Sequence, residues 1–184
     1  MIRRALITGG AGFVGRVLSR RLESTGWEVV RCDISIPRDE PGWLACNVGD
    51  RSDVERAFAE AGAVTHVFHL AAVTFVPAAG RDPAGTFRAN LQGTVHVAEA
   101  MRRAHPDARL VFIASGEVYG APVSLPITEQ HPLNPVNPYA ISKTAADQYC
   151  RWLHAAEGVD TIRMRPFNHT GPGQNDAFAL PAFA

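Results

Sequence analysis

Tyr139 and Lys143 are the two residues whose types and spacing most directly suggest chemistry. They stand four residues apart near the start of an expected helix, so both side chains lie on one face of it. A free phenol has a pKa of about 10, which is too high for efficient proton transfer at neutral pH. A nearby ammonium group stabilises the phenolate and lowers that pKa. The pair could therefore pass a proton to or from an alcohol or ketone oxygen.

Two further features of the sequence support a chemical role for this pair. Ser115 ends an expected strand, and its hydroxyl could bond the same oxygen. Lys143 is the only lysine in a chain whose other basic residues are all arginine, and arginine cannot always replace an ammonium group. Chance in an arginine-rich composition is the alternative explanation. A Tyr-x-x-x-Lys pair is common on helix surfaces, so the interpretation also depends on a glycine-rich loop near the N-terminus.

That loop, Thr8–Gly15, follows the first expected strand and opens the first expected helix. Gly9 permits a tight turn, Gly12 lets a pyrophosphate approach the backbone, and Gly15 lets the helix lie close to the sheet. Free N–H groups and the helix dipole then favour an anion. The alternative is a turn that is merely tight. The position at the first strand–helix junction favours a dinucleotide site, where Lys143 could bond a ribose hydroxyl.

Asp33 ends the second expected strand, where dinucleotide-binding folds place an acidic residue that bonds the ribose hydroxyls. A carboxylate repels a 2′-phosphate, so Asp33 favours NAD over NADP. Arg31 and Arg38 lie close in sequence and weaken that preference. The alternative is an ordinary turn residue at a strand end.

Short apolar runs alternate with longer helical patterns along the whole chain. This alternation predicts a doubly wound, Rossmann-type α/β fold with a parallel sheet covered on both faces. Ligands of such sheets bind at the carboxyl ends of the strands, where the candidate residues stand. The expected strands are 5–8, 27–32, 43–46, 64–70, 109–114 and 159–164, and the expected helices are 13–25, 50–61, 82–104 and 138–157.

Composition excludes several classes of protein. Apolar residues make up 46% of the chain and charged residues 20%, which fits a globular core. The formal net charge is zero, which argues against a chain-wide attraction to nucleic acid or anionic membrane. Three widely spaced cysteines fit a reducing, cytoplasmic compartment. The seven histidines are scattered, so we expect no metal site, and His69 is expected to be a packed residue at a strand end.

The motifs together resemble the extended short-chain dehydrogenase/reductases, the NAD-dependent epimerase/dehydratase family that acts on nucleotide sugars. The resemblance covers essentially the whole chain. Its finer features are similar to GDP-mannose 4,6-dehydratases and GDP-6-deoxy-D-mannose reductases. The motifs that carry it are TGGAGFVG at 8–15, HLAA at 69–72, NLQGT at 90–94, SGEVYG at 115–120, PYAISK at 138–143 and RPFNHTGPGQ at 165–174.

The resemblance implies roles for particular residues. The catalytic set would be Ser115, Tyr139 and Lys143, with Glu117 as a further acid–base group. Relatives often carry Asp-Leu after the third strand, where this chain has Asn47-Val48; asparagine can still bond an adenine edge. The implied cofactor contacts are Gly9, Gly12, Phe13, Val14, Gly15, Asp33, Asn47, Val48, Leu70, Ala71, Ala72, Asn90, Tyr139, Lys143 and Pro166. The implied substrate contacts are Ser115, Gly116, Glu117, Tyr139 and Asn168.

The leading hypothesis is reduction of the C4 ketone of a GDP-4-keto-6-deoxyhexose with NAD, or NADP, in which Tyr139 protonates the C4 oxygen. A dehydratase that uses Glu117 on the C5 proton and a 4-epimerase are the enzymatic alternatives. A dinucleotide-binding sensor or scaffold without turnover is the alternative from another class. Such a protein is expected to lose Tyr139 or Lys143, and both are present.

The resemblance also bears on domain organisation and assembly. Relatives continue well beyond Ala184, so we expect a fragment or a truncated gene product whose smaller C-terminal substrate domain is largely absent. Residues 1–166 would form the NAD(P)-binding domain, and residues 167–184, with their apolar end at 178–184, would begin the substrate-binding region. Family members commonly pair through two long helices, here 90–104 and 139–157, which implies a homodimer.

Overall fold

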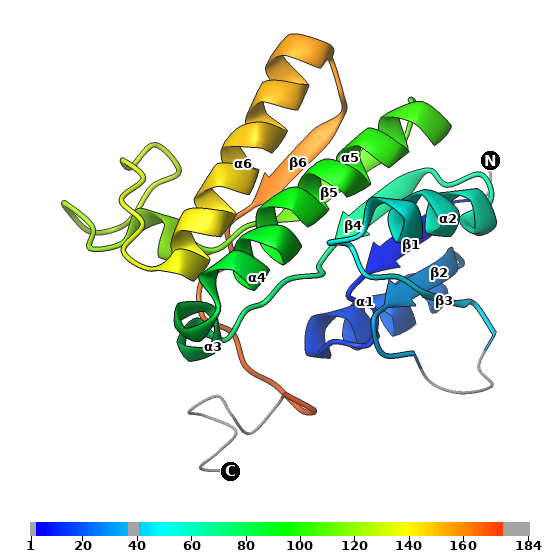
Figure 1. Ribbon diagram of the computed structural model, residues 1–184, viewed down its shortest axis with the longest axis horizontal. Coiled ribbons are helices and arrows are strands. Elements are labelled where there is room, and N and C mark those ends of the chain that lie inside the picture. The colour runs from blue at the N-terminus through cyan, green and yellow to red at the C-terminus, as the bar shows by residue number, and fades with distance from the viewer. Residues whose placement is uncertain (1–2, 37–40, 175–184) are drawn as a thin grey trace.

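The computed structural model describes residues 3–36 and 41–174, and these form a six-stranded parallel sheet flanked by helices (Figure 1). The order of the strands across the sheet is β3-β2-β1-β4-β5-β6. The Rossmann-type fold predicted from the sequence is therefore confirmed. The strands are β1 (Arg4–Thr8), β2 (Glu28–Asp33), β3 (Trp43–Ala45), β4 (His66–His69), β5 (Arg109–Ile113) and β6 (Thr161–Met164).

The strand order has one consequence for the site. From β1 the chain builds outward through β2 and β3, and then crosses back to place β4 on the other side of β1. The connections that leave β1 and β4 therefore diverge at the carboxyl edge of the sheet. Such a switch point is where sheets of this kind bind their ligands.

Three long helices cover one face of the sheet. They are α2 (Arg51–Ala61), α5 (Gly93–Ala104) and α6 (Pro138–Glu157), and α5 and α6 lie side by side over the β4–β6 half (Figure 1). Their apolar sides meet strand residues such as Leu6, Leu110 and Phe112, all completely buried. Burial of a large apolar side chain stabilises the fold by about 1.5–3 kcal/mol, so this layer is the main core.

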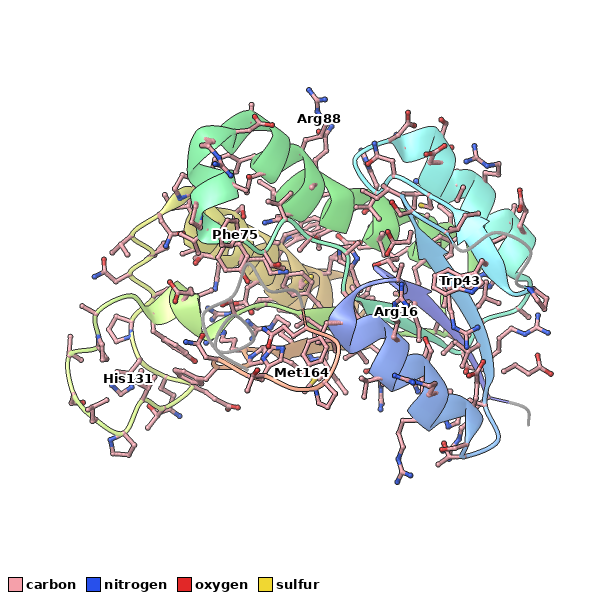
Figure 2. The ribbon with its side chains drawn as sticks, turned by 90° about the horizontal axis from the view of Figure 1, so that it is seen from below. Arg16, Trp43, Phe75, Arg88, His131 and Met164 are labelled. Atoms are coloured by element: carbon pink, nitrogen blue, oxygen red, sulfur yellow. The ribbon has the colours of Figure 1, made fainter. Side chains whose placement is uncertain are left out.

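The opposite face is covered less fully than the sequence pattern suggested. Helix α1 (Phe13–Glu23) lies there, below the sheet in Figure 2, against β1 and β2. Toward the β6 edge, Ile162 is 42% exposed and Met164, labelled in Figure 2, is 50% exposed. The expectation of helices on both faces therefore holds only for part of the sheet among the described residues.

The long helix expected over 82–104 is interrupted in the structure. Helix α3 (Val76–Arg81), which the sequence analysis missed, precedes α4 (Pro83–Phe87), the π-helical turn η1 (Arg88–Gln92) and then α5. Asp82 adopts φ −132° and ψ 78° because the residue before a proline is kept out of the helical region. Its side chain then accepts a hydrogen bond from the Gly85 N–H and caps α4. Helix α5 accordingly begins at Gly93 and not at Asn90.

The other boundaries agree to within a few residues. Helix α6 spans the predicted range because Pro138 begins it after the Asn137 cap, and Gly158 ends it with a left-handed φ of 69°. The expected loop 116–137 opens with a short 3₁₀ turn, η2 (Gly116–Tyr119). Among residues 3–36 and 41–174, none of the helices combines the length and the apolar character that a membrane span requires.

Candidate active site

The glycine loop lies where β1 and β4 end and leaves no room for a side chain at Gly9 or Gly15. Gly9 has a φ of +70°, and a Cβ there would stand 2.7 Å from the Ala71 backbone nitrogen. A Cβ on Gly15 would overlap the Gly9 carbonyl oxygen, so α1 packs directly on the loop. Both glycines are therefore required by close backbone approaches, as the sequence motif predicts.

The N-terminus of α1 is suited to an anion. Gly12 is its N-cap, with no side-chain cap and no acidic residue in the first turn of this described helix. The backbone N–H groups at the start of the helix therefore lack the usual carboxylate or hydroxyl partner, and the dipole adds partial positive charge. Phe13 and Val14 stand in this first turn. The loop can hold a diphosphate, as the sequence analysis expects.

Asp33 lies at the end of β2 and is bonded to the glycine loop. One carboxylate oxygen accepts the Ala11 N–H at 3.0 Å, and the other accepts the Ser35 N–H at 3.2 Å. The carboxylate is thereby held beside the phosphate loop, and each oxygen keeps a lone pair for a ribose hydroxyl. Arg31 is turned elsewhere: it forms an ion pair with Glu23, and its guanidinium lies 5.6 Å from the ring centre of Trp43, which Figure 2 labels. Arg38 falls outside the described residues.

The next stretch, after β3, forms one side of the expected adenine position. The Asn47 side-chain oxygen accepts the Gly49 N–H at 3.0 Å, and the Asn47 N–H is bonded to Asp53 at 3.0 Å. Val48 is 6% exposed and packs on Gly93, where a Cβ would come within 2.8 Å of a Val48 methyl group. The segment is thus rigidly placed, and it supplies an amide and an apolar surface.

Tyr139 and Ser115 come together at the carboxyl end of the sheet. Each is 8% exposed, and the Ser115 hydroxyl oxygen accepts the Glu117 N–H at 3.2 Å. Burial raises the pKa of Tyr139 above its usual value; the nearby Ser115 hydroxyl lowers it in part, and the charge of Glu117 raises it. Glu117 itself is exposed, and its carboxylate lies 3.5 Å from the side-chain nitrogen of Asn137, the cap of α6.

Lys143 is buried on the same helix one turn further on. It is 3% exposed, and its Nζ lies 4.8 Å from the centre of the Phe112 ring. Burial lowers its pKa to about 8, against the opposing charges of Cys150 and Asp147. Lys143 is not among the groups that shift the pKa of Tyr139, so the expected lowering of the phenol pKa by the ammonium group is not seen. Tyr139 and Lys143 do lie on one helix, as expected, but burial decides the direction in which the pKa of each group shifts.

Asn90 joins the loop after β4 to the helix that carries Tyr139. Its side-chain oxygen accepts the Val73 N–H at 2.7 Å, and its amide nitrogen donates to the Val73 carbonyl and to the Ser142 hydroxyl at 3.0 and 2.9 Å. Ser142 in turn donates to the Tyr139 carbonyl at 2.7 Å. Asn90 therefore supports the loop that begins at Leu70, Ala71 and Ala72, and both N–H groups of its side-chain amide are already bonded to protein groups.

The expected substrate side is more open. The Gly116 N–H is bonded to the Pro166 carbonyl at 2.8 Å, and a Cβ on Gly116 would stand 2.9 Å from the Phe167 ring. Asn168 is exposed. His169 stacks on Phe13 at 6.3 Å between ring centres, so the segment after β6 lies against the glycine loop. The apolar end at 178–184 lies outside the described residues.

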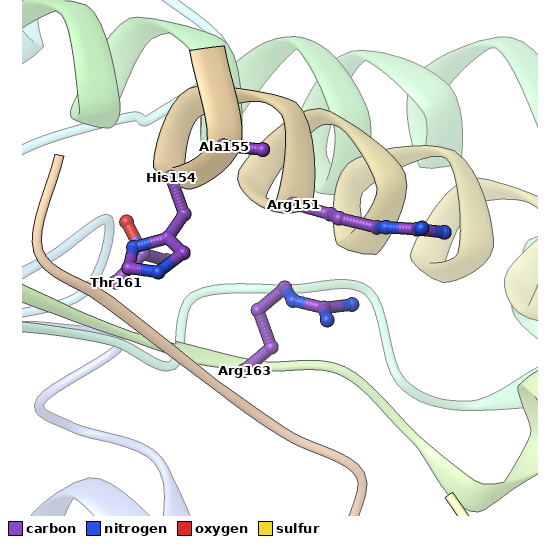
Figure 3. Close-up of a pocket in the computed structure, with 5 residues that line it drawn as sticks. All are labelled: Arg151, His154, Ala155, Thr161 and Arg163. Carbon is purple, nitrogen blue, oxygen red and sulfur yellow. The ribbon is translucent and has the colours of Figure 1, made fainter. Parts of the chain in front are cut away.

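One hollow stands apart from this site. It has a volume of about 340 Å³ and lies between the C-terminal half of α6 and β6 (Figure 3). Since Tyr139 is in the first turn of α6, this hollow is at the other end of the helix. It is lined by Arg151, His154, Ala155, Thr161 and Arg163.

A buried ion-pair cluster, which was not predicted from the sequence, lies behind the site. Asp147 is completely buried and accepts hydrogen bonds from Arg163 and Arg165 at 2.8 and 2.7 Å. Arg165 also donates to the Tyr119 hydroxyl at 2.9 Å. Asp147 stands four residues after Lys143, and Arg165 is the first residue of the RPFNHTGPGQ motif. This spacing and this motif were the sequence features that could have predicted the cluster. The cluster ties α6 to β6 and η2.

Comparison with known proteins agrees with this geometry. The chain is 37% identical over 188 residues to GDP-6-deoxy-D-mannose reductase of Pseudomonas aeruginosa, an alignment that covers all of this chain and 58% of that protein. The solved structure of RMD from Pseudomonas aeruginosa complexed with NADPH has a TM-score of 0.83 and 34% identity, over 99% of this chain and 58% of that one. The UDP-glucose 4-epimerase of Thermus thermophilus, solved in complex with NAD, has a TM-score of 0.86 and 34% identity, over 94% and 58%.

The chain therefore spans somewhat more than half the length of these relatives. The sequence model described as "NAD dependent epimerase/dehydratase family" matches residues 5–184. Since that match takes in both the glycine loop and the Ser115–Tyr139 pair, the chain belongs to the NAD-dependent epimerase/dehydratase family.

Proposed function

We propose that the protein is a cytoplasmic NAD(P)-dependent oxidoreductase that reduces the C4 ketone of a GDP-4-keto-6-deoxyhexose. The observation that carries the proposal is the placement of Ser115 and Tyr139, both nearly buried, at the carboxyl edge of the sheet, with Lys143 one helical turn from Tyr139. The relative named GDP-6-deoxy-D-mannose reductase supports the choice of sugar nucleotide.

The residues present fit a dinucleotide. Close backbone approaches at Gly9 and Gly15 shape a tight loop, the N-terminus of α1 has no side-chain cap, and Asp33 stands beside it. We assign the diphosphate to Gly12, Phe13 and Val14, the adenosine to Asp33, Asn47 and Val48, and the nicotinamide half to Ala71, Ala72, Tyr139, Lys143 and Pro166. Bound there, NAD(P)H supplies the hydride that the C4 carbon accepts.

The chain's own residues then handle the proton. The phenol of Tyr139 donates its proton to the C4 oxygen as that oxygen gains negative charge, and it is left as phenolate. The Ser115 hydroxyl orients the same oxygen. Lys143 bonds a ribose hydroxyl and keeps a positive charge near the phenolate, since its pKa of about 8 leaves it protonated at neutral pH. Solvent returns a proton to Tyr139 after each turnover.

The relative named GDP-6-deoxy-D-mannose reductase favours reduction over the enzymatic alternatives. A proton donor must be protonated at the start of the reaction, and burial keeps this phenol neutral. A 4,6-dehydratase or a 4-epimerase first oxidises C4, which requires Tyr139 to begin as a phenolate. The epimerase retains support from the Thermus thermophilus relative, and the dehydratase from Glu117 two residues after Ser115. A sensor or scaffold without turnover has no use for the intact Ser115, Tyr139 and Lys143.

We further propose that residues 1–166 are the cofactor-binding part and that residues from 167 onward begin the substrate-binding part. Asn168 is exposed next to the Gly116–Pro166 hydrogen bond, where it is free to contact the sugar nucleotide together with Glu117.

Tyr139→Phe tests the proton donor. We expect kcat for ketone reduction by the full-length protein to fall by about 10²–10⁴-fold, because the substituted ring has no proton to donate. The dissociation constant for NADH should stay within about threefold, a change of less than ~1 kcal/mol in binding free energy. Tyr149→Phe on the same helix, whose hydroxyl bonds Glu99 at 3.0 Å, is the matched control. Unchanged turnover in Tyr139→Phe would refute the assignment.

Glu117→Gln separates reduction from dehydration. A reductase needs no base at C5, so we expect its kcat to change by less than about fivefold, whereas a dehydratase that uses this carboxylate would lose about 10²–10⁴-fold. The measurement is turnover of the GDP-4-keto-6-deoxyhexose and, separately, of GDP-mannose. Glu129→Gln, in the loop that follows, is the control. Turnover of GDP-mannose that disappears in Glu117→Gln would establish the dehydratase instead.

Asp33→Ser tests cofactor choice. The carboxylate at the end of β2 repels a 2′-phosphate, so the unaltered protein should bind NADH at least about tenfold more tightly than NADPH, a difference of ~1.4 kcal/mol. Asp33→Ser should remove most of that preference, which fluorescence titration of both nucleotides would measure. Asp160→Ser, which removes an exposed carboxylate paired with Arg109, is the control. Equal affinities in the unaltered protein would contradict the preference for NAD.

We also propose a homodimer formed through α5 and α6. Trp152 on α6 is 48% exposed and stacks on Tyr149 at 5.9 Å, which leaves a large aromatic surface beside the two helices. Light scattering should give twice the monomer mass, and Trp152→Glu should give the monomer because it places a charge in the interface. Val123→Glu, in a loop where Val123 is 79% exposed, should leave the dimer intact. A monomeric mass for the unaltered protein would rule the proposal out.

A further inference from the structure

His69 is a completely enclosed histidine with a hydrogen-bond partner on each ring nitrogen. It is the last residue of β4 and is 1% exposed. Its Nδ1 lies 2.7 Å from the hydroxyl of Thr8, the last residue of β1, and its Nε2 lies 3.0 Å from the hydroxyl of Thr94 in α5. The ring thus joins the strand that enters the glycine loop to the helix layer above the sheet.

The bond on the Nε2 side fixes where the proton lies. The Thr94 hydroxyl is 2.6 Å from the Asn90 carbonyl oxygen, and a carbonyl can only accept. The single hydroxyl proton of Thr94 therefore points at Asn90. Toward His69 that hydroxyl can only accept, so Nε2 carries the proton.

The bond on the Nδ1 side requires the ring to be neutral. The Thr8 hydroxyl oxygen already accepts the Ala71 N–H at 3.2 Å. If Nδ1 is unprotonated, it accepts a hydrogen bond from the Thr8 hydroxyl, and every polar hydrogen in this series of bonds then has an acceptor. If Nδ1 were protonated, it would compete for the same oxygen and would no longer accept the Thr8 proton. The neutral ring with its proton on Nε2 is the form that satisfies all these groups.

The chain of bonds continues to the turn that holds Tyr139. Asn90, whose carbonyl accepts from Thr94, donates through its side chain to the Ser142 hydroxyl at 2.9 Å. Ser142 donates to the Tyr139 carbonyl at 2.7 Å. Buried networks in which every group is satisfied are stiff, because any displacement leaves a polar group unpaired in a low-dielectric interior. Thr8 and Tyr139 are therefore linked through a continuous set of buried groups.

The charge near His69 favours the same form. The rings of His69 and Phe112 are 6.0 Å apart, and the Lys143 Nζ lies 4.8 Å from the Phe112 ring. Burial, and then the charge of Lys143, lowers the pKa of His69 to about 3. A protonated His69 would place a second buried positive charge near Lys143, whose own pKa is already lowered by burial.

We propose that His69 is a positioning residue for the Tyr139 site: its neutral, Nε2-protonated ring holds the Tyr139 turn at a fixed place relative to the glycine loop. The kinetic part of this proposal rests on the proposed function, in which Tyr139 is the proton donor. The bonding part, which is the state of the ring, does not rest on it. Small misplacements of a reacting group cost rate steeply, about 10²-fold for 1 Å, so a stiff link between the two halves of the site has a direct use.

The state of the ring is tested without any substrate. Nitrogen-15 NMR of the histidine side chains in the full-length protein should show His69 neutral, with its proton on Nε2, at every pH from about 5 to about 8, the range in which an ordinary histidine changes its charge. Thr94→Val should strongly shift only the His69 Nε2–H signal, and the other histidine signals serve as references in the same spectra. Titration of His69 within this range, or a proton on Nδ1, would overturn the bonding part of the proposal.

Variants test the positioning. Thr94→Val removes the link while keeping the side-chain volume, and His69→Asn keeps a polar group near Thr8 but does not reach Thr94. Each should lower kcat, measured per molecule that binds NADH, by about tenfold to a hundredfold. The double variant should be no worse than either single variant, because both substitutions interrupt the same series of hydrogen bonds. His69→Gln, which reaches Thr94, should recover part of the loss. His66→Asn, on the same strand and half-buried, is the matched control.

The outcomes separate the two proposals. A role in folding alone would lower the melting temperature but leave kcat per NADH-binding molecule unchanged, and that result would overturn the positioning role. If the unaltered protein reduces no sugar-nucleotide ketone, the proposed function fails. The NMR measurement still decides the bonding part in that case.

Discussion

The contact between the ends of β1 and β4 is the constraint on which the rest of the site depends. At this point the backbone of Gly9 approaches the Ala71 nitrogen so closely that a Cβ would stand 2.7 Å away. The strand order places these two ends side by side and sends their connections in opposite directions. A crevice at the carboxyl edge follows from that topology, but only a residue without a side chain lets it close into a phosphate loop.

Hydrogen bonds between buried groups connect the end of β1 to the turn of α6 that carries Tyr139. Thr8 lies one residue before Gly9 and is hydrogen-bonded to His69, which is hydrogen-bonded to Thr94. The Thr94 hydroxyl in turn donates to the Asn90 carbonyl. Further along α6, Asp147 holds Arg163 and Arg165 of the segment that leads to the substrate side. The first turn of α6 is therefore fixed by one network and its middle by another.

Local rules account for the features that could be predicted from the sequence. The glycine spacing and the range 138–157 of α6 are set by backbone geometry within a few residues, and both appear as expected. The break at Asp82 also has a local cause in Pro83, but the helical periodicity on either side hid it. The bonds of His69 and Asp147 join residues 16 to 61 positions apart, and no periodicity shows such pairings. For Lys143 the spacing predicts the helix face but not the burial that decides its pKa.

Burial acts in opposite directions on the two titrating groups of the site. It raises the pKa of the Tyr139 phenol and lowers that of the Lys143 ammonium, since in each case it disfavours the charged form. As pH rises, Lys143 therefore loses its proton first, at a pH of about 8, while Tyr139 is still protonated. A phenolate beside an ammonium group is consequently not the resting state. Under the proposed reduction, a phenolate would form only when the phenol gives its proton to a substrate oxygen.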